Sequence, residues 1–589
     1  MFGNDPFILL DDAREKDAAP SRLYRDPIAT IEASSLDTLD AGLAQISEAR
    51  QSGHHVAGYI SYEAGLALEQ KLTSRLTDDL ACPLLWFGVF KDYQEMDPQT
   101  LAKACPDPEG AWLGPLEPQI SRADYDVAFD AVQEYIQAGD IYQANLTFSA
   151  IARFSGHPMA LYAAIRDRAR AGYGGVVFDG RNWMLSFSPE LFFARKGNRI
   201  TARPMKGTAA RHRVESEDAK VREQLRKDPK QRAENLMIVD LLRNDLSRIA
   251  KPGTVQVPEL FHVESYPTIH QMTSTVTADL DDMQDVSGLL RQMFPCGSIT
   301  GAPKIRAMEI IDQLEATQRG IYCGSIGRID ANGDAAFNVA IRTFFLSADQ
   351  QAGQEKLSIG LGSGIVADSK CDDEWQECLA KGRFAAVHDI NVDLMETMAF
   401  DPANGIARLE AHLERMKTSA AALEFEFDRH AARNTLHAVT FHQEQSAKVR
   451  MMLSKSGALA IELQPMPAPL TEPANCKLVP MEADKADYRL HHKTSDRRIY
   501  NVSGLEQGEH PIFVDADGFV TEGAIWNVFV ERDGKLLTPP LTRGVLPGVL
   551  RAELLENGDA VEADLTAADL DSGLWVGNSL RGLIKAQLR

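Results

Sequence analysis

Three charged residues in the second half of the chain, Glu374, Glu377 and Lys381, have the spacing of side chains on one face of a helix. Residues three and four apart are neighbours on an α-helix, so two carboxylates and an amine could act together there. The preceding stretch, LSIGLGSGIVADS, is strand-like, and glycines such as Gly362 and Gly364 let backbone N–H groups approach an anion. A solvated charged face would explain the helix alone, but the glycine-rich strand before it favours an anion-binding site.

A lysine at position 206 offers a different chemistry. Lys206 lies between Pro204 and Gly207 in TARPMKGTAAR, which we interpret as a turn. A lysine in a turn is usually solvated and unreactive. A lysine that has lost its solvent has a lowered pKa and can act as a nucleophile, so the role of Lys206 depends on what surrounds it.

Two further segments could contribute to such a site. RAENLMIVDLLRNDLSRI (232–249) is apolar almost all round and predicts a buried helix. Buried ion pairing is the alternative for Asp240 and Arg243, whereas Glu234 at the helix start is placed to reach into a site. GSITGAPK (297–304) lacks the Walker spacing, because only three residues separate its glycines. We therefore expect no nucleotide there, but a helix start that faces a loop.

The last third of the chain has its own candidates. Lys493 lies in HKTSDRRIY, which predicts a loop, and GVLPG (544–548) precedes a predicted helix. Free backbone N–H groups at a helix start make a good phosphate cradle. VGNSLRG (576–582) adds a hydroxyl group and further amides. By themselves these features could be a surface lysine and ordinary turns.

Composition limits the kinds of partner. The chain has 589 residues, 44% hydrophobic and 25% charged, with a net charge of −22, which is typical of a soluble protein of several domains. No basic stripe is present for nucleic acid, and an anionic ligand would need local cations or a metal. No stretch approaches the ~18 apolar residues of a membrane span. Seven cysteines without a CxxC pair indicate reduced thiols in the cytoplasm.

Three regions must position these residues: 1–118, 119–388 and 389–589. In the first, HHVAGYISYEA and PLLWFGVFKDY predict strands. The second begins with a predicted helix that starts at Ser121 and ends at Gly139. The third begins with the strand-like INVDLMETMAF, directly after a helical pattern.

Eight motifs in the second region resemble the chorismate-utilising enzymes, the family of anthranilate, isochorismate and aminodeoxychorismate synthases. They are GDIYQANL, SPE, RPMKGT, RAENLMIVDLLRND, GSITGAPK, YCGSIG, AIRT and GSGIVADS. The resemblance implies an α+β fold, a sandwich of two antiparallel sheets with outer helices. Gln143 stands where water-adding members carry a lysine base, and Lys206 stands where anthranilate and isochorismate synthases typically carry alanine. The resemblance is therefore to component I of the aminodeoxychorismate synthase branch.

This resemblance implies covalent catalysis. The Lys206 amine would attack C2 of chorismate, Glu190 would protonate the departing C4 hydroxyl, and ammonia would add at C4. Mg²⁺, held by Glu234 and Glu377, would clamp the ring carboxylate. The residues that the resemblance assigns to substrate binding are Gln143, Thr300, Tyr322, Arg342, Gly362, Gly364, Lys381 and His270. No glutaminase signature is present, so ammonia would come from solution or from a separate glutamine amidotransferase subunit.

The third region resembles the fold-type IV pyridoxal-phosphate enzymes, especially 4-amino-4-deoxychorismate lyase and branched-chain or D-amino-acid aminotransferases, and this implies an α/β domain. Lys493 would bind the cofactor covalently, and Glu522 would face its pyridine nitrogen. The groups expected to bind its phosphate are Arg415, the amides of Val545 and Leu546, and Ser579. An active site of this kind would release 4-aminobenzoate and pyruvate, and a homodimer through this domain is the family expectation.

Two alternatives stay open. The first is that the chain is an anthranilate synthase component I, which would make anthranilate from chorismate and ammonia. The second is that the C-terminal domain is an inactive scaffold that binds a partner or supports dimerisation.

Overall fold

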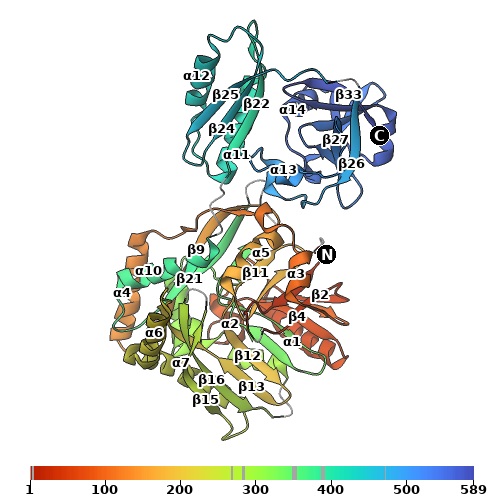
Figure 1. Ribbon diagram of the computed structural model, residues 1–589. Coiled ribbons are helices and arrows are strands. Elements are labelled where there is room, and N and C mark those ends of the chain that lie inside the picture. The colour runs from red at the N-terminus through yellow and green to blue at the C-terminus, as the bar shows by residue number, and fades with distance from the viewer. Residues whose placement is uncertain are drawn as a thin grey trace.

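The protein folds into two bodies, one above the other in Figure 1. The computed structural model describes residues 2, 5–16, 18–266, 269–281, 285–347, 350, 355–386, 392–470 and 473–589. The lower body contains the chain up to residue 386, and the upper body contains it from residue 392 onward. The expected boundary near residue 388 lies outside the described residues. None of the described helices is both long and apolar enough to cross a membrane.

The lower body is a sandwich of two large antiparallel sheets, which confirms the predicted fold class. In the described part of the chain, eleven strands form the first sheet, and nine of them follow the order β17-β9-β21-β20-β11-β10-β1-β2-β6. Their bounds are β1 Phe7–Asp11, β2 Ser21–Arg25, β6 Gln94–Met96, β9 Gln143–Ser155, β10 Gly174–Phe178, β11 Trp183–Ser186, β17 Gly301–Ala302, β20 Thr343–Leu346 and β21 Lys356–Ile365; β7 (Trp112–Leu113) and β8 (Glu117–Pro118) also pair with β9.

The second sheet has ten described strands, in the order β14-β16-β13-β12-β19-β18-β4-β5-β3, with β15 beside β16. Their bounds are β3 Ala29–Ala33, β4 His55–Ile60, β5 Leu85–Phe90, β12 Leu191–Lys196, β13 Arg199–Arg203, β14 Met205–Ala210, β15 Gln256–Ser265, β16 Ile269–Asp279, β18 Ser325–Ile329 and β19 Ala335–Asn338. Apolar side chains of β1, β10 and β11 meet those of β4, β5 and β18 in one buried cluster between the sheets. Strands from residues 1–118 therefore belong to both sheets.

Helices cover the outer faces. Against the second sheet pack α1 (Leu36–Gln51), α7 (Pro229–Ser247) and α8 (Val286–Met293), and against the first pack α4 (Arg122–Gln137), α5 (Pro158–Ala169), α9 (Lys304–Leu314) and α10 (Cys371–Gly382). The shorter α2 (Ala64–Leu68), α3 (Pro98–Ala104) and the exposed α6 (Glu215–Lys227) complete the described α-helices of this body. The predicted helix from Ser121 is confirmed: the Ser121 hydroxyl accepts from the Asp124 amide, and Gly139 follows the last turn with φ of 81°.

Helix α7 is less buried than its apolar sequence predicts. Ile238 and Leu242 pack into the core, but Leu236 is 43% exposed. Asp240 and Arg243 form their ion pair at 2.8 Å with more than half of each side chain exposed. The expectation of a helix buried all round, and of a buried pair on it, is wrong, because only one face of α7 meets β14 and β16.

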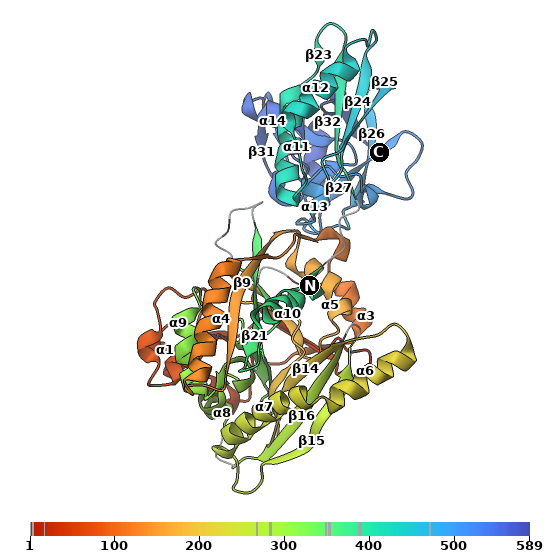
Figure 2. The ribbon, with the colours of Figure 1, turned by 90° about the vertical axis from the view of Figure 1, so that its left-hand side faces the viewer.

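The upper body contains two further sheets and is an α/β structure, as predicted. The smaller has the order β23-β22-β24-β25, and the larger, of mixed parallel and antiparallel pairs, has the order β28-β27-β26-β33-β32-β29-β30-β31. Their bounds are β22 Leu394–Asp401, β23 Gly405–Ile406, β24 Ala447–Leu453, β25 Leu459–Pro465, β26 Ala474–Pro480, β27 Glu509–Val514, β28 Val520–Gly523, β29 Asn527–Arg532, β30 Lys535–Thr538, β31 Ala560–Glu562, β32 Leu574–Asn578 and β33 Gly582–Leu588. The described helices are α11 (Leu409–Leu423), α12 (Arg429–Thr440), α13 (Tyr488–His491) and α14 (Val549–Glu556), and both views show α13 beside the lower body (Figure 2).

Candidate active sites

A cavity of about 240 Å³ opens in the lower body where β14, β21, α7 and α10 meet. Nine residues predicted for chemistry or binding line it: Glu190, Lys206, Glu234, Tyr322, Arg342, Gly362, Gly364, Glu377 and Lys381. They come from separate strands, loops and helices of the sandwich, so the fold gathers them into one place.

Lys206 lies on strand β14, so the prediction of a turn is wrong. The pairing of β14 with β16 shifts register around this residue, and Gly207 has φ of 99°, a conformation that favours glycine. The Lys206 Nζ lies 3.7 Å from Glu234 Oε2, with 21% of the lysine side chain exposed. Asn235 Nδ2 donates to the Lys206 carbonyl at 3.3 Å, which ties this irregular strand to α7.

The absence of a side chain at Gly364 leaves space for both the Lys206 amine and the Gln143 amide. A Cβ at position 364 would lie 2.7 Å from Lys206 Nζ and 2.9 Å from Gln143 Nε2. Gln143 is fully buried, and neither its Oε1 nor its Nε2 has a hydrogen-bond partner among the described residues. A buried amide without partners is costly unless a ligand or water completes it. Gln143 is therefore positioned beside the amine, behind the cavity wall.

Glu190 is a buried acid on the cavity wall, 4% exposed. The Ser298 hydroxyl donates to Glu190 Oε1 at 2.7 Å. Burial raises the pKa of Glu190 to about 7, although this hydrogen bond and the charge of Lys206 oppose the rise. A carboxyl group with such a pKa is protonated in about half of the molecules at neutral pH and can give its proton to a leaving group.

The pH dependence of the reaction should report this acid. If Glu190 acts in its protonated form, kcat for chorismate consumption is expected to fall as pH rises through about 7. Because the Ser298 hydrogen bond favours the carboxylate, Ser298→Ala should raise the pKa of Glu190 and move this fall to higher pH. Steady-state rates across neutral pH on both proteins measure the shift; a fall that stays at the same pH in the variant would contradict the assignment.

Glu234 and Glu377 face the cavity from α7 and α10. Burial raises the pKa of Glu234; the charge of Lys206 opposes this, and the like charges of Glu374 and Glu377 add to it. Desolvation would also raise the pKa of Glu377, but the Lys381 ammonium at 2.8 Å and the charges of Lys206 and Lys230 together lower that pKa. The negative charges of these carboxylates therefore repel one another, and a divalent cation bound between them would relieve that repulsion.

The donor set fits a cation that keeps several waters. The described residues contain no group of three or more His, Cys, Asp or Glu side chains suited to a metal. Mg²⁺ is commonly bound through one or two carboxylates, with waters and a ligand oxygen completing its shell. Glu234 and Glu377 match that pattern.

Two cations, Arg342 and Lys381, also line this cavity and could bind the carboxylates of a ligand. Arg342 has φ of 51°, a conformation that is rare for a residue other than glycine and is concentrated at functional sites. Burial lowers the pKa of Arg342, and its Cζ lies 5.9 Å from the centre of the Phe384 ring. The Lys381 Nζ donates to the Gly362 carbonyl at 2.8 Å, which holds the lysine against the glycine-rich strand.

Besides Gln143, which lies behind the wall, two predicted substrate residues, Thr300 and His270, are not among the described residues that line this cavity. The Thr300 hydroxyl donates to the Cys296 carbonyl at 3.2 Å. The ring nitrogens of His270 contact Asp218 at 2.9 Å and Ser265 at 2.8 Å. In this structure both side chains stabilise the surrounding turns and strands.

Lys230 and Ser298 are among the lining residues that no sequence pattern had indicated. Lys230 precedes Glu234 by four residues on α7, so the helical spacing that indicated Glu374 beside Glu377 could have identified it too. Nothing in the local sequence distinguishes Ser298, whose contact with Glu190 joins residues 108 positions apart.

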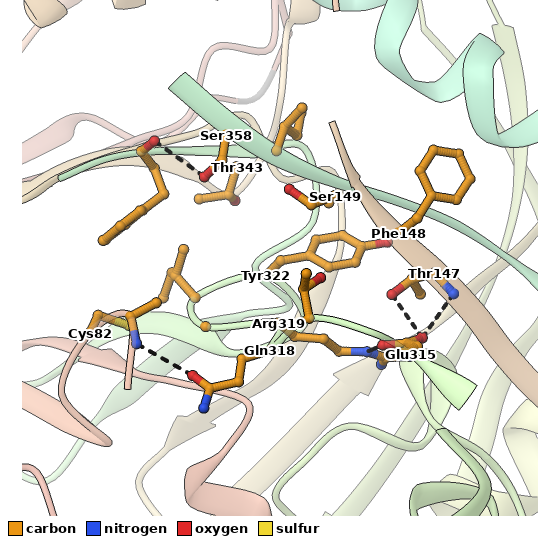
Figure 3. Close-up of a pocket in the computed structure, with 17 residues that line it drawn as sticks. Cys82, Thr147, Phe148, Ser149, Glu315, Gln318, Arg319, Tyr322, Thr343 and Ser358 are labelled. Carbon is orange, nitrogen blue, oxygen red and sulfur yellow. Dashed lines mark hydrogen bonds and ion pairs between the residues drawn. The ribbon is translucent and has the colours of Figure 1, made fainter. Parts of the chain in front are cut away.

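Tyr322 also lines a smaller cavity, of about 80 Å³ (Figure 3). Tyr322 and Gly360 line both cavities, and a Cβ at Gly360 would collide with the tyrosine ring. Glu315 accepts hydrogen bonds from the amide and hydroxyl of Thr147 and pairs with the buried Arg319 at 2.7 Å. These polar groups are satisfied within the protein and hold the wall of this smaller cavity.

The upper body has a cavity of about 380 Å³ where its two sheets face each other. Lys493, Arg415, Glu522, Leu546 and Ser579 line it, all predicted for the cofactor. Burial lowers the pKa of Lys493 to about 7, and the charge of Arg415 adds to the effect. A lysine of this kind is neutral in about half of the molecules at neutral pH and can act as a nucleophile or base.

Two hydrogen bonds hold the Glu522 carboxylate in the wall of this cavity. Its Oε1 accepts from the Tyr500 hydroxyl at 2.6 Å, and its Oε2 accepts from the Leu546 amide at 3.0 Å. Burial raises the pKa of Glu522 to about 7. The Leu546 amide thus already has an acceptor, and Val545 is fully buried. A phosphate bound in this cavity would therefore depend on groups other than these two predicted amides.

Arg415 and Ser579 provide those groups. Arg415 forms a two-point ion pair with the buried Glu396, at 2.8 and 2.6 Å, and also donates to the Pro547 carbonyl. The Ser579 hydroxyl lies 2.7 Å from His412 Nε2. This network fixes a guanidinium and a hydroxyl at one side of the cavity, and such a pair suits a phosphate.

Four further cations, which no sequence pattern had indicated, also line this cavity. Lys448 and Arg450 alternate on β24 and line the cavity together with Arg497 and Arg581. The Arg497 Nη1 is buried and has no hydrogen-bond partner among the described residues. The i, i+2 spacing of Lys448 and Arg450 on a strand could have indicated a shared cationic face.

Each of the two bodies matches a known protein family. Residues 5–387 match the family described as chorismate binding enzyme, and residues 393–587 match the family described as amino-transferase class IV. Aminodeoxychorismate synthase component 1 from Klebsiella aerogenes is 38% identical over 343 residues, which are 55% of this chain and 74% of that protein. Anthranilate synthase component 1 from Thermus thermophilus is 35% identical over 358 residues, 56% of this chain and 76% of that protein.

A solved structure supports the fold of the lower body. Anthranilate synthase component I from Streptococcus pneumoniae superposes with a TM-score of 0.53 at 24% identity, and covers 63% of this chain and 93% of its own. At that identity the likeness concerns the fold alone.

Proposed function

This chain belongs to the chorismate binding enzyme family, and from that premise we propose that its lower body converts chorismate and ammonia to 4-amino-4-deoxychorismate. The observation that carries the proposal is a single cavity that presents both the Lys206 amine and the buried, protonatable Glu190. A nucleophile and an acid on one wall are what a covalent displacement of a hydroxyl group needs. The relatives named aminodeoxychorismate synthase component 1 support the choice of product.

The reaction balances in two displacements. The neutral amine of Lys206 forms a bond to C2 of chorismate as the ring double bonds shift. The C4–O bond breaks, and Glu190 gives its proton to the oxygen, which leaves as water. Ammonia then forms a bond at C4, the double bonds shift back, the C2–N bond breaks, and the Lys206 amine is released.

Charged groups around the cavity hold the substrate. Arg342 and Lys381 line the cavity and would bind its carboxylates. The unpartnered amide of Gln143, which lies behind the wall at Gly364, is a further polar group that a ligand or water could satisfy. Glu234 and Glu377 would hold Mg²⁺, which when bound supplies positive charge beside the ring carboxylate.

We propose that the upper body removes pyruvate from this product to give 4-aminobenzoate. Pyridoxal phosphate, when bound, supplies an electron sink. Lys493 would hold the cofactor and, in its neutral form, would take the proton from C4 of the substrate, so that the enolpyruvyl group leaves and becomes pyruvate. Glu522 would hold the pyridine nitrogen, and Arg415 with Ser579 would hold the phosphate.

The cations on β24 fit this substrate. 4-Amino-4-deoxychorismate carries two carboxylates, and Lys448, Arg450 and Arg497 line the cavity wall. The buried, unpartnered Nη1 of Arg497 is a donor that a carboxylate would satisfy. A formed cavity around a lysine of lowered pKa supports an active site over an inactive scaffold.

Anthranilate synthase activity is the second candidate, because a relative with that name is 35% identical. That reaction would place the amino group at C2 rather than C4. Lys206 disfavours it, since a lysine amine that occupies C2 directs ammonia to C4.

We also propose a source of ammonia, an oligomeric state and a cellular compartment for this protein. A separate glutamine amidotransferase subunit would supply ammonia, which the designation of the relatives as component 1 supports. A homodimer through the upper body is expected from the resemblance. All seven cysteines are free, which suits a reducing compartment such as the cytoplasm.

The covalent route is tested by withholding ammonia. The protein is incubated with chorismate and Mg²⁺ without ammonium, quenched, digested and examined by mass spectrometry. We expect the peptide that contains Lys206 to gain the mass of chorismate less one water, and addition of ammonium before the quench to remove this adduct. Turnover with ammonium but no adduct without it would argue against the Lys206 route.

A further inference from the structure

One buried arginine holds both sides of the loop that carries Lys493. Asp487 and Asp496 flank this lysine in sequence, and Arg489 contacts both: its Nη2 lies 2.6 Å from Asp487 Oδ2, and its Nη1 lies 3.2 Å from Asp496 Oδ2. The Arg489 side chain is only 1% exposed. The position of Lys493 therefore depends on a guanidinium that must find acceptors for its N–H groups inside the protein.

The lower body supplies one of those acceptors. Asp107 Oδ2 lies 2.6 Å from Arg489 Nη2, the nitrogen whose other contact is Asp487. Next to it, Glu109 pairs with Arg498, which also contacts Asp496. Helix α13, which contains Arg489, lies at the junction of the two bodies in both views (Figures 1 and 2).

An aromatic residue anchors the same segment. Trp112 lies on β7, which pairs with β9 of the lower body, yet its indole is 4% exposed within an apolar cluster of the upper body that includes Leu394 and Tyr488. Between Asp107 and Trp112, the backbone of Gly110 packs on the loop: a Cβ there would lie 2.5 Å from Asp487 Oδ2. Residues 107–112 thus belong to one body and complete the packing of the other.

We propose that residues 107–112 act as a positioning element of the second site. They order the loop that carries Lys493 and thereby strengthen the binding of pyridoxal phosphate. The expected change in cofactor affinity rests on the proposed role of Lys493 in binding pyridoxal phosphate. The second site would then be complete only when the two bodies are docked.

The test uses full-length variants. Asp107→Ala removes the acceptor; Asp107 is half-exposed and not part of either cavity's chemistry, so the fold is expected to survive. Asp107→Asn keeps an oxygen that can accept from Arg489. Arg153→Ala is the matched control, because Arg153 pairs with Glu424 at 3.7 Å and donates to the Ala421 carbonyl, a contact between the bodies away from the loop.

Three quantities are measured on each protein: backbone hydrogen exchange of residues 487–498 without cofactor, pyridoxal-phosphate affinity by absorbance titration, and the rate of chorismate consumption. We expect Asp107→Ala to speed exchange in this loop and to weaken cofactor binding roughly tenfold. Asp107→Asn and Arg153→Ala should stay within about threefold of the unmodified protein. Chorismate consumption should be unchanged in all three.

Unchanged exchange and affinity in Asp107→Ala would overturn the inference. Equal losses in Arg153→Ala would also overturn it, because they would indicate general loosening between the bodies. An unmodified protein that binds no pyridoxal phosphate would refute the cofactor role of Lys493, while the exchange measurement would still decide the positioning role.

Discussion

Lys206→Ala is expected to lower kcat for chorismate consumption by roughly 10³-fold or more, as removal of a covalent nucleophile does. Glu190 and the Mg²⁺ ligands would remain, but no group would occupy C2 while the C4 hydroxyl leaves. Loss of chorismate with ammonium and Mg²⁺ measures the effect. 4-Amino-4-deoxychorismate supplied directly should still be converted, because the cavity of the upper body is untouched.

A second lysine on the same wall provides the control. Lys230 lines the cavity but pairs with Asp368 at 3.2 Å, and Lys230→Ala should cost less than about tenfold. If Lys206→Ala stayed within tenfold of the unmodified protein, or if both variants lost activity equally, Lys206 would not be the nucleophile.

Lys493→Ala is expected to separate the two reactions. Chorismate consumption should continue, 4-amino-4-deoxychorismate should accumulate, and the rate of 4-aminobenzoate formation should fall roughly 10³-fold or more. The physical reason is the loss of the buried amine, whose pKa of about 7 lets it both hold the cofactor and accept a proton. Chromatography of the products over time measures both effects.

Borohydride treatment after addition of pyridoxal phosphate supplies an independent readout. The cofactor should be fixed on the peptide that contains Lys493 in the unmodified protein and be absent from this peptide in Lys493→Ala. Lys448→Ala, which removes another lysine of the same cavity, should still be labelled at Lys493. An unmodified protein that takes no label at this lysine would favour the inactive-scaffold alternative.

Local sequence patterns predicted much of the framework. The Ser121 cap and the following apolar spacing give the helix that the structure shows, and the glycine-rich strand and the helix with Glu377 follow each other as expected. These features depend on neighbours within a few residues, so a sequence contains the necessary information.

The remaining features depend on contacts between distant residues. The irregular pairing that places Lys206 on a strand involves β16, and Asp218 engages His270 from another element. Ser298 and the cations of β24 likewise acquire their roles only when the sheets and helices come together. The contact of Asp107 with Arg489 joins residues 382 positions apart, and no local pattern indicates it.

The identity of the final product tests the central claim most directly. The full-length protein is incubated with chorismate, ammonium, Mg²⁺ and pyridoxal phosphate, and the products are separated by chromatography beside authentic 4-aminobenzoate and anthranilate, because these isomers have the same mass. The proposed reactions predict 4-aminobenzoate and pyruvate in equal amounts. Anthranilate as the main product would contradict them.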